Sequence, residues 1–394
     1  MKFTVSRALL AHGLKIANTV LDKKDKEPGY DQIIFAIKKG QLALSGFSRS
    51  AGTRYILPVL SHDGEGVFTL PANRIVPLVR EFSGSEITFD VASHVVMMNN
   101  GSSSVVSFRL FDKKEVLAFP KIVPLYSFHV PFDTLRDTLH RVLPFASTAK
   151  GGGPFRNVLF DLAYVDETSV RLDIVATDTV GLARGRVMID NSFDLLLSEE
   201  TPSRRILCDR DLMLDLLQLL SNDTRHSASL PVTIDVNERY IEVSWGEIRF
   251  YARVAAASFP DYNAVFALPL TETSLTFSGS DFAASLRRLA IVSSDETPGE
   301  SVFSFKVFDK DSELYLASES TEVGAASEFL PCTHSTVVDL KLNFRYIQLV
   351  AELGKNSELT MKTLLCENDP TVWGFSDLPG LSLIVMPVAE ELAG

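Results

Sequence analysis

Cysteine is scarce in this sequence, which has only Cys208, Cys332 and Cys366 among 394 residues. The three lie far apart, and none belongs to a C-x-x-C pair. This spacing argues against a zinc site and against a disulfide framework. It fits a protein of the reducing cytoplasm.

Long apolar runs are also missing. No segment approaches the length of a membrane span, and the opening MKFTVSRALL lacks the pattern of a secretory signal. We therefore expect a cytoplasmic protein with no membrane partner.

The common catalytic motifs are absent as well. The sequence has no G-x-x-x-x-G-K-[ST], no G-x-G-x-x-G after a strand, no H-E-x-x-H and no G-x-S-x-G. Its seven histidines are scattered without metal-ligand spacing. Asp173 and Asp178 lie on one predicted strand but face opposite sides, so a joint catalytic role is not expected. We predict no catalytic residue, no metal and no cofactor.

What is present is enough apolar sequence for several cores. Hydrophobic residues make up 46% of the chain and charged residues 22%, and the length suits about three domains of roughly 130 residues. The net charge of −12 is unusual for a protein that binds nucleic acid. Overall acidity, however, does not say where the basic side chains lie.

One plan of elements recurs three times along the chain. Each copy has an amphipathic helix, alternating strand-like runs, a second helix and further strands. The predicted first helices are Ser6–Val20, Phe132–Ala146 and Asp281–Val292. The predicted second helices are Ala72–Phe82, Asp209–Leu220 and Asn343–Leu353. The starts of the second helices are almost evenly spaced, which indicates a repeat of pattern.

Proline-containing stretches separate the copies. Phe119–Tyr126 and Phe259–Pro269 each contain two prolines and are predicted linkers. Lys150–Pro154 and Ser293–Glu300 are predicted loops. We therefore predict an α+β fold of three repeated domains, at residues 1–126, 127–265 and 266–394, each with two helices packed on antiparallel sheets.

The predicted helices carry basic residues away from their apolar faces. In the first helix Leu9, Gly13, Ile16 and Val20 share the face expected to be buried, and the opposite face is basic. Taken together the predicted helices have a slight excess of positive charge, whereas the chain carries −12. The exposed basic side chains predicted to face outward from the core are Arg7, Lys15, Arg74, Arg80, Arg136, Arg141, Arg287 and Arg288.

Several short segments resemble the beta sliding clamp of bacterial DNA polymerase III. They are MKFTV at the start, Val175–Asp178, Phe259–Tyr262 and Val385–Val388, with weaker similarity at Phe68–Ala72 and Asn343–Tyr346. Each is weak evidence alone, but they occur in the family's order and spacing over essentially the whole chain.

The resemblance implies a ring-forming protein that is not an enzyme. It implies a head-to-tail homodimer whose helices line a hole around double-stranded DNA, with the basic residues named above facing the DNA. Contacts would be with phosphates and independent of sequence. Such a ring confers processivity on a DNA polymerase in DNA replication. Any 3'-5' exonuclease activity would belong to the holoenzyme only.

The resemblance also implies a pocket for short peptide motifs of the polymerase, the clamp loader and repair proteins. Its lining would be mostly apolar, with Thr, Asn and Tyr groups to orient a peptide backbone. The residues carried over are Phe155, Thr177, Thr179, Val180, Gly181, Leu182, Pro260, Val265, Asn343, Tyr346, Val385, Met386, Pro387 and Val388. Ring closure is expected between Val106 and Phe108 on one copy and Ile291 and Val292 on the other.

This sequence departs from the family pattern at the pocket. Thr179-Val180-Gly181 stands where the family usually has glycine or arginine, then an aromatic residue or histidine, then arginine. Ala264 and Ala389 stand where basic residues are common, and Glu390–Gly394 runs past the usual end. An alternative is therefore a diverged clamp paralogue that acts as an interaction scaffold with altered partner specificity.

Overall fold

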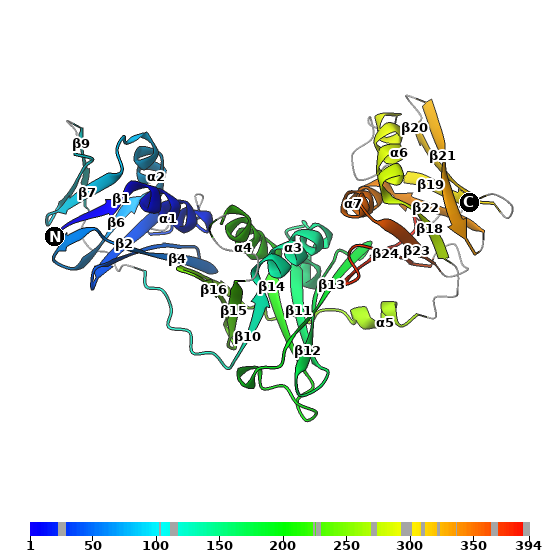
Figure 1. Ribbon diagram of the computed structural model, residues 1–394, viewed down its shortest axis with the longest axis horizontal. Coiled ribbons are helices and arrows are strands. Elements are labelled where there is room, and N and C mark those ends of the chain that lie inside the picture. Colours follow the sequence, from blue (N-terminus) through cyan, green and yellow to red (C-terminus); the bar gives the residue numbers. More distant parts are fainter. Residues whose placement is uncertain are drawn as a thin grey trace.

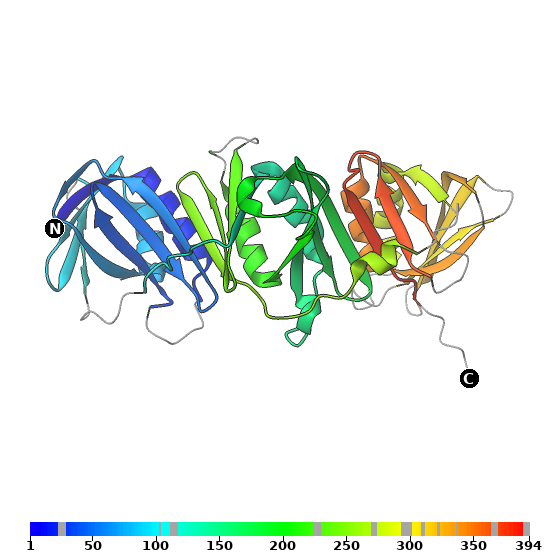
Figure 2. The ribbon, with the colours of Figure 1, turned by 90° about the horizontal axis from the view of Figure 1, so that it is seen from below.

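The chain forms a long crescent of antiparallel sheets and short helices (Figure 1). The computed structural model describes residues 1–22, 29–101, 104–110, 117–223, 225, 230–268, 274–292, 302–308, 312–320, 324–335, 337–363 and 369–388. The predicted loop at 293–300 and the tail at 390–394 lie outside this range. The helices gather on the concave side, and a view from the convex side shows strands in front of them (Figure 2).

Each long helix starts at the residue that follows a strand, without a loop between them. In the described part of the chain this unit occurs six times. The strands are β1 (Lys2–Ser6), β6 (Gly66–Pro71), β10 (Tyr126–Pro131), β14 (Ser203–Asp209), β18 (Ser274–Ser278) and β22 (Val338–Asn343). The helices that follow them are α1 (Arg7–Thr19), α2 (Ala72–Glu81), α3 (Phe132–Val142), α4 (Arg210–Asn222), α6 (Gly279–Val292) and α7 (Phe344–Gly354).

The helices pack in three pairs, which confirms the predicted architecture of two helices per repeat. Helix α1 packs on α2, α3 on α4, and α6 on α7, while α1 also meets α4. Alternation along the strands explains this packing: in β10, Tyr126, Phe128 and Val130 point to the core and the residues between them point outward. The boundary that we place after residue 265 falls inside the short helix α5 (Tyr262–Phe266), and the domain boundaries stay predictions.

Two of the sheets run from one repeat into the next. Among the described residues the first has eight strands in the order β10-β15-β16-β17-β4-β3-β2-β6. Strand β17 pairs with β4, with Phe250 opposite Thr53, and this pair joins the first repeat to the second. The strands not yet bounded are β2 (Gln32–Lys38), β3 (Gln41–Phe47), β4 (Ala51–Pro58), β15 (Pro231–Val236), β16 (Tyr240–Trp245) and β17 (Ile248–Arg253).

The second of these sheets joins the middle repeat to the last. Its twelve described strands follow the order β14-β11-β12-β13-β25-β24-β23-β18-β21-β20-β19-β22, and the junction is the pair β13–β25. The remaining bounds are β11 (Asn157–Tyr164), β12 (Ser169–Thr177), β13 (Gly181–Asp190), β19 (Val302–Val307), β20 (Glu313–Ser320), β21 (Gly324–His334), β23 (Glu358–Lys362), β24 (Thr371–Phe375) and β25 (Leu381–Val385).

A smaller sheet completes the first repeat. Its described strands follow the order β5-β1-β7-β8-β9, so β9 lies at an edge. The bounds are β5 (Ser61–Asp63), β7 (Glu86–Val91), β8 (Val95–Asn99) and β9 (Val105–Arg109). Single turns of 3₁₀-helix occur at η1 (Leu143–Phe145), η2 (Gly153–Arg156) and η3 (Phe193–Leu195).

Some local expectations were wrong in detail. On α1 the core residues are Leu10 and Leu14, which are fully buried, whereas Leu9 is half-buried. Gly13, Ile16 and Val20 are buried as predicted, so Leu9 is the one member of the predicted face that is not. The predicted loop at 150–154 runs into η2, and the predicted linker at 259–269 contains α5. Proline and glycine in these segments are typical of loops, so the sequence pattern did not predict the short helical turns.

Both linkers are attached to the convex face of the sheets by aromatic contacts. The ring of Phe119 meets Tyr251 edge to face at 5.0 Å between centroids, and Arg54 lies 4.4 Å from the Phe119 ring centroid. At the second linker, Arg184 lies 3.7 Å from the ring centroid of Phe266. The two junctions between repeats are therefore covered by equivalent cation–π contacts.

Candidate functional site

The junction of β13 and β25 brings together two segments that are 200 residues apart in sequence. Gly181 lies opposite Val385 in the register of the two strands. Beyond the strand ends, the backbone N–H of Met386 donates to the carbonyl of Val180 at 2.9 Å. The N–H of Val388 donates to the carbonyl of Lys341 on β22 at 2.8 Å. The predicted pocket segments at 177–182 and 385–388 therefore lie side by side.

A tight turn between β12 and β13 forms one lip of this site. The Asp178 carboxylate accepts hydrogen bonds from the backbone N–H groups of Val180 and Gly181, at 3.3 and 3.0 Å. The Thr177 hydroxyl donates to the Gly181 carbonyl at 2.8 Å and accepts from the Thr179 N–H. Thr179 has a φ of +84°, in the left-handed region that β-branched residues rarely adopt.

The start of α7 forms the floor. Asn343 caps the helix, because its side-chain oxygen accepts from the Arg345 N–H at 3.0 Å. The Tyr346 hydroxyl donates to Asp178 at 2.6 Å, and its ring lies beside Phe145. Burial and this hydrogen bond raise the pKa of the Tyr346 hydroxyl above its ordinary value.

The remaining surface of the site is apolar. Val180 and Val388 are 38% and 37% exposed, and Pro260 is exposed. Phe155, Val265, Met386 and Pro387 are half-buried, while Leu182 and Val385 belong to the core. Leu182 and Val265 share an apolar cluster with Phe259, Tyr262 and Ile384, so the linker helix α5 forms one side of the site.

Three of the four polar side chains carried over to orient a peptide are engaged in hydrogen bonds within the chain, and the fourth, Thr179, is exposed. Thr177 bonds within its own turn, Asn343 caps α7, and Tyr346 bonds to Asp178. Folding uses these three groups as a turn, a cap and a contact between repeats, and their role in orienting a peptide stays a prediction. Asp178, Arg345 and Phe145, which hold Tyr346, were not among the predicted site residues.

A second polar network lies beneath α5. The Tyr262 hydroxyl donates to the buried carboxylates of Asp161 and Asp173, at 3.0 and 3.2 Å. Arg186 donates to both oxygens of Asp173, at 2.8 and 2.9 Å. Asp173 lies on β12 and Asp178 in the turn that follows it, and the two carboxylates have different partners. No motif in the sequence marks Asp161 or Asp173 as a residue that anchors α5.

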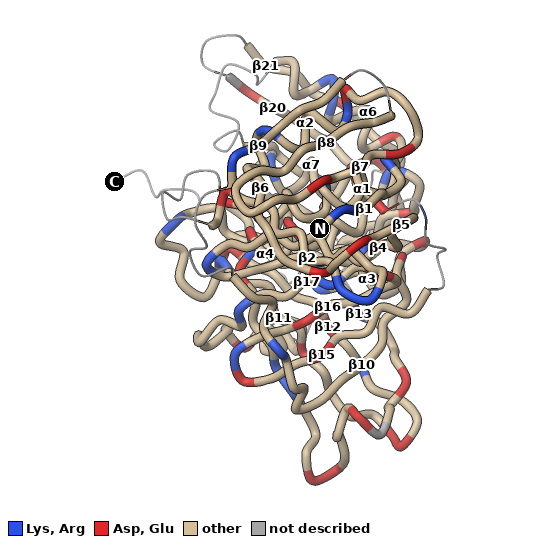
Figure 3. The backbone as a smooth tube through the Cα atoms, turned by 90° about the vertical axis from the view of Figure 1, so that its left-hand side faces the viewer, with Lys and Arg blue, Asp and Glu red and all other residues tan. Residues whose placement is uncertain are grey.

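Basic and acidic positions are both scattered along the backbone when the molecule is viewed from one end (Figure 3). Arg74, Arg80 and Arg287 are exposed. Four of the other predicted lining residues contact neighbours. Arg7 donates to the carbonyl of Gly84, Lys15 to Asn222, Arg136 pairs with Asp133 and Asp137, and Arg288 pairs with Glu328.

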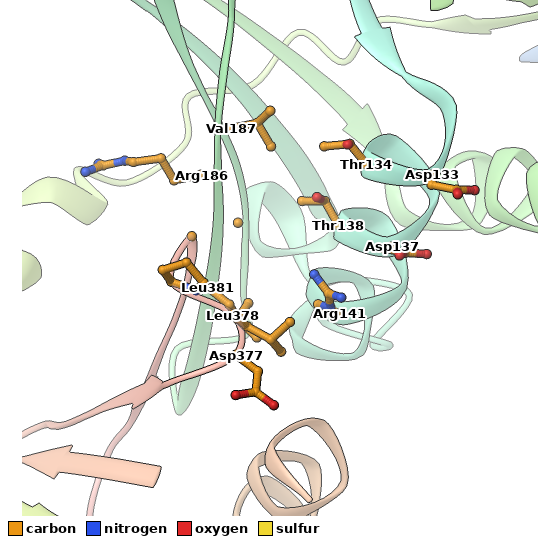
Figure 4. A pocket seen from close by; sticks show the side chains of 13 residues that line it. Asp133, Thr134, Asp137, Thr138, Arg141, Arg186, Val187, Asp377, Leu378 and Leu381 are labelled. Atoms are coloured by element: carbon orange, nitrogen blue, oxygen red, sulfur yellow. The ribbon is translucent and has the colours of Figure 1, made fainter. Parts of the chain in front are cut away.

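The eighth predicted lining residue, Arg141, borders a cavity of about 290 Å³ between α3 and the turn that joins β24 to β25 (Figure 4). Asp133, Asp137 and Asp377 also line it, together with Thr134 and Thr138. The carboxylates around Arg141 offset its charge, so this part of the surface is less basic than the sequence suggests.

The residues predicted for ring closure lie at an edge strand and at a helix end. Val106 and Phe108 on β9 are half-buried against the core, whereas Val105 beside them is 64% exposed. Ile291 at the end of α6 is 72% exposed, and Val292 is half-buried. Strand β18 pairs with β21 only at Cys332–His334, so the Gly324–Phe329 part of β21 has no second strand partner among the described residues.

Among the described residues no helix is long and apolar enough to cross a membrane. No group of three or more His, Cys, Asp or Glu side chains in that part of the chain could hold a metal ion.

Known proteins resemble this chain in sequence and in fold. Residues 1–116 match the family described as DNA polymerase III beta subunit, N-terminal domain. The beta sliding clamp of Haemophilus influenzae is 21% identical over 363 residues, which cover 92% of each chain. The beta sliding clamp of Helicobacter pylori is 22% identical over 294 residues, which cover 75% of this chain and 74% of that one.

Solved structures share the fold over nearly the full length. A sliding clamp from Bartonella birtlesii, solved bound to griselimycin, has a TM-score of 0.86, 20% identity and 99% coverage of both chains. The DNA polymerase III beta subunit from Thermotoga maritima has a TM-score of 0.82 and 21% identity, covering 99% of this chain and all of that one.

The fold, with its paired helices on the concave side of continuous sheets, is that of the sliding clamps. The match of residues 1–116 to the beta subunit's N-terminal domain and the similarity to curated beta sliding clamps agree with this fold, and together they confirm the resemblance seen in the sequence.

Proposed function

We propose that this chain is a DNA sliding clamp, a dimeric ring that encircles duplex DNA and confers processivity on a DNA polymerase in the cytoplasm. The observation that carries the proposal is the crescent with all six long helices of the described chain on its concave side (Figure 1). A crescent that pairs head to tail with a second copy closes into a ring when the rotation permits. The proposed role is not enzymatic.

Closure of the ring would use the free edges at the two ends of the crescent. Strand β9 is an edge strand in the first repeat, and the Gly324–Phe329 part of β21 presents an edge in the third. Val106 and Phe108 on one copy would meet Ile291 and Val292 on the other. Pairing of exposed strand edges removes unsatisfied backbone groups, and Ile291 supplies apolar contact.

Binding to DNA would rest on phosphate contacts from the lining helices. Arg74, Arg80 and Arg287 are exposed. Arg136 and Arg288 already have carboxylate partners, so their contribution would be smaller. Loose, sequence-independent contacts suit a ring that slides, because base-specific contacts would stop it.

Partners would bind at the apolar site between β13 and the 385–388 segment. We propose that the DNA polymerase, the clamp loader and repair proteins insert a short apolar peptide there. The exposed and half-buried apolar side chains at Val180, Val265 and Met386 support this site.

Substitutions at the two proposed surfaces test this function separately. Met386→Ala together with Pro387→Ala is expected to abolish binding of an apolar peptide, measured by fluorescence anisotropy, while light scattering still gives the mass of a dimer. Ile291→Asp is expected to give the mass of a monomer and to retain peptide binding. Unchanged peptide affinity in the double variant would rule out the pocket assignment, and a dimeric Ile291→Asp variant would rule out the assigned interface.

A further inference from the structure

Gly181 has no room for a side chain. A Cβ atom built on it would lie 2.5 Å from two ring carbons of Tyr346 and 2.9 Å from a ring carbon of Phe145. Such distances are well inside van der Waals contact, so any other residue at 181 must displace the Tyr346 ring. The backbone at Gly181 does not have a positive φ, so the constraint is steric and not conformational.

The position of Tyr346 decides which polar groups reach the surface. With its ring against Gly181, the Tyr346 hydroxyl donates to Asp178, which also accepts from two backbone N–H groups of its own turn. The Asp178 side chain is only 10% exposed. Arg345 is held nearby, 3.7 Å from the Asp178 carboxylate, and it donates to the carbonyl of Pro144 at 3.2 Å.

We propose that Gly181 determines the specificity of the peptide site. Because it admits the Tyr346 ring, it withdraws the Tyr346 hydroxyl and the Asp178 carboxylate from the binding surface. A partner then meets mainly apolar side chains and backbone groups, with Thr179 and part of Arg345 as the polar side chains left at the surface. The site therefore selects a short segment chiefly by its aliphatic and aromatic side chains. This inference rests on the proposed peptide-binding function.

The apolar surface around the turn fits this chemistry. Val180 is exposed on one side of Gly181, and Val388 is exposed on the other side of the site. Between them Met386 and Pro387 are half-buried and apolar. Binding would be driven by burial of apolar area, because the nearby ion pair and hydrogen bonds are already satisfied within the chain.

The test compares the affinities of matched peptides. The probe is a fluorescein-labelled six-residue peptide of Ala and Ser with one Leu-Phe pair, and its versions carry Gln, Asp or Lys beside the pair. For the unmodified protein we expect Gln, Asp or Lys to change the dissociation constant by less than about threefold. Replacing the Leu or the Phe by Ala is expected to weaken binding by about tenfold or more.

Variants of the chain then connect specificity to Gly181. Gly181→Ala is expected to expel the Tyr346 ring and to expose Asp178, which shifts the affinity ratio by about fivefold or more toward the lysine peptide. Tyr346→Phe keeps the ring but frees the carboxylate, and we expect a smaller shift in the same direction. Gly374→Ala is the matched control, because a Cβ there meets only the Thr360 carbonyl at an ordinary 4.0 Å.

The outcomes separate this inference from the function on which it rests. A strong preference of the unmodified protein for the glutamine, aspartate or lysine peptide would overturn the inference and leave the peptide site standing. Unchanged ratios in both Gly181→Ala and Tyr346→Phe would overturn it as well. Failure of every peptide to bind the unmodified protein would overturn the peptide site itself, and this inference with it.

Discussion

Thr179 has a backbone conformation that suits its side chain poorly. Its φ of +84° belongs to the region that glycine adopts without cost, yet it carries a β-branched side chain. The Asp178 carboxylate and the Thr177 hydroxyl hold the turn through hydrogen bonds to backbone groups. These bonds maintain the strained residue at the lip of the peptide site.

Replacement of this residue by glycine should stabilise the protein. We expect Thr179→Gly to raise the free energy of unfolding by about 1 kcal/mol, because relief of strain exceeds the extra entropy of glycine in the unfolded chain. Thr179→Ala should raise it less, since alanine keeps part of the strain. Urea unfolding of the three proteins measures the difference. A loss of stability in the glycine variant would show that the turn is not strained.

Asp215 on α4 makes the stability of the folded chain depend on pH. Burial, with a smaller contribution from the charge of Asp211, raises the pKa of Asp215 from its ordinary value of 3.8 to about 7. Between these values the folded chain binds a proton that the unfolded chain has lost. The resulting stability is fully present below about pH 4 and is lost as the pH rises through 7.

A neutral side chain at this position should remove that dependence. We expect Asp215→Asn to raise the free energy of unfolding by about 1–2 kcal/mol more at pH 8 than at pH 5. Thermal unfolding across this range measures the effect. The exposed Asp190, replaced by Asn, serves as the control and should show no such trend. Parallel pH profiles for Asp215→Asn and the unmodified protein would contradict the raised pKa.

At the scale of elements, the linker helix α5 depends on one hydroxyl. Tyr262 is 2% exposed and donates to two buried carboxylates, and burial raises its pKa above the ordinary value. Without the hydroxyl, Asp161 and Asp173 would each lose a donor in a buried setting. Such a loss costs more than an exposed hydrogen bond does.

We therefore expect Tyr262→Phe to lower the free energy of unfolding by about 1–3 kcal/mol. The change is measured as the shift of the urea midpoint, with Tyr240→Phe at the first linker as the control. Tyr240 packs edge to face on Tyr251, and that ring contact survives the loss of the hydroxyl. If the two variants had equal midpoints, the Tyr262 hydroxyl would not hold α5.

The sequence predicts long regular elements well and short irregular ones poorly. Periodicity locates all six long helices of the described chain, because the apolar faces of helices such as Phe132–Val142 repeat over three turns. It does not reveal α5, which has five residues between prolines and a buried tyrosine that contacts distant strands. The Asp261 side chain caps the start of this helix by accepting from the Asn263 N–H at 3.2 Å, but the helix is too short for an apolar periodicity to show it.

The candidate site shows the same limit. Similarity to the family brings Val180 and Met386 to one place, and the structure joins them by a backbone hydrogen bond. Similarity does not show that Tyr346 bonds to Asp178, because this contact depends on the space left by Gly181 in another repeat. Because Gly181 has no side chain, the Tyr346 ring fits beside it, and this determines which polar groups are available at the site.

At the scale of the whole molecule, the shape of the fold supports a ring around DNA more strongly than the distribution of charged residues does. The crescent and its lining helices match known clamps over nearly the entire chain. The concave helices, by contrast, carry paired as well as exposed basic residues, within a chain of net charge −12. We infer that the ring holds DNA by its closed shape, with electrostatic attraction in a supporting role.

Retention on DNA of different topology tests this claim most directly. The protein is loaded by a clamp loader onto nicked circular DNA, and the fraction that stays bound through gel filtration in high salt is compared before and after the circle is cut. A closed ring that slides should stay on the circle for many minutes, in spite of the salt, and should leave the linear DNA quickly through its ends. Equal loss from circular and linear DNA, with a strong dependence on salt, would contradict encirclement and would show that the chain binds DNA only by charge.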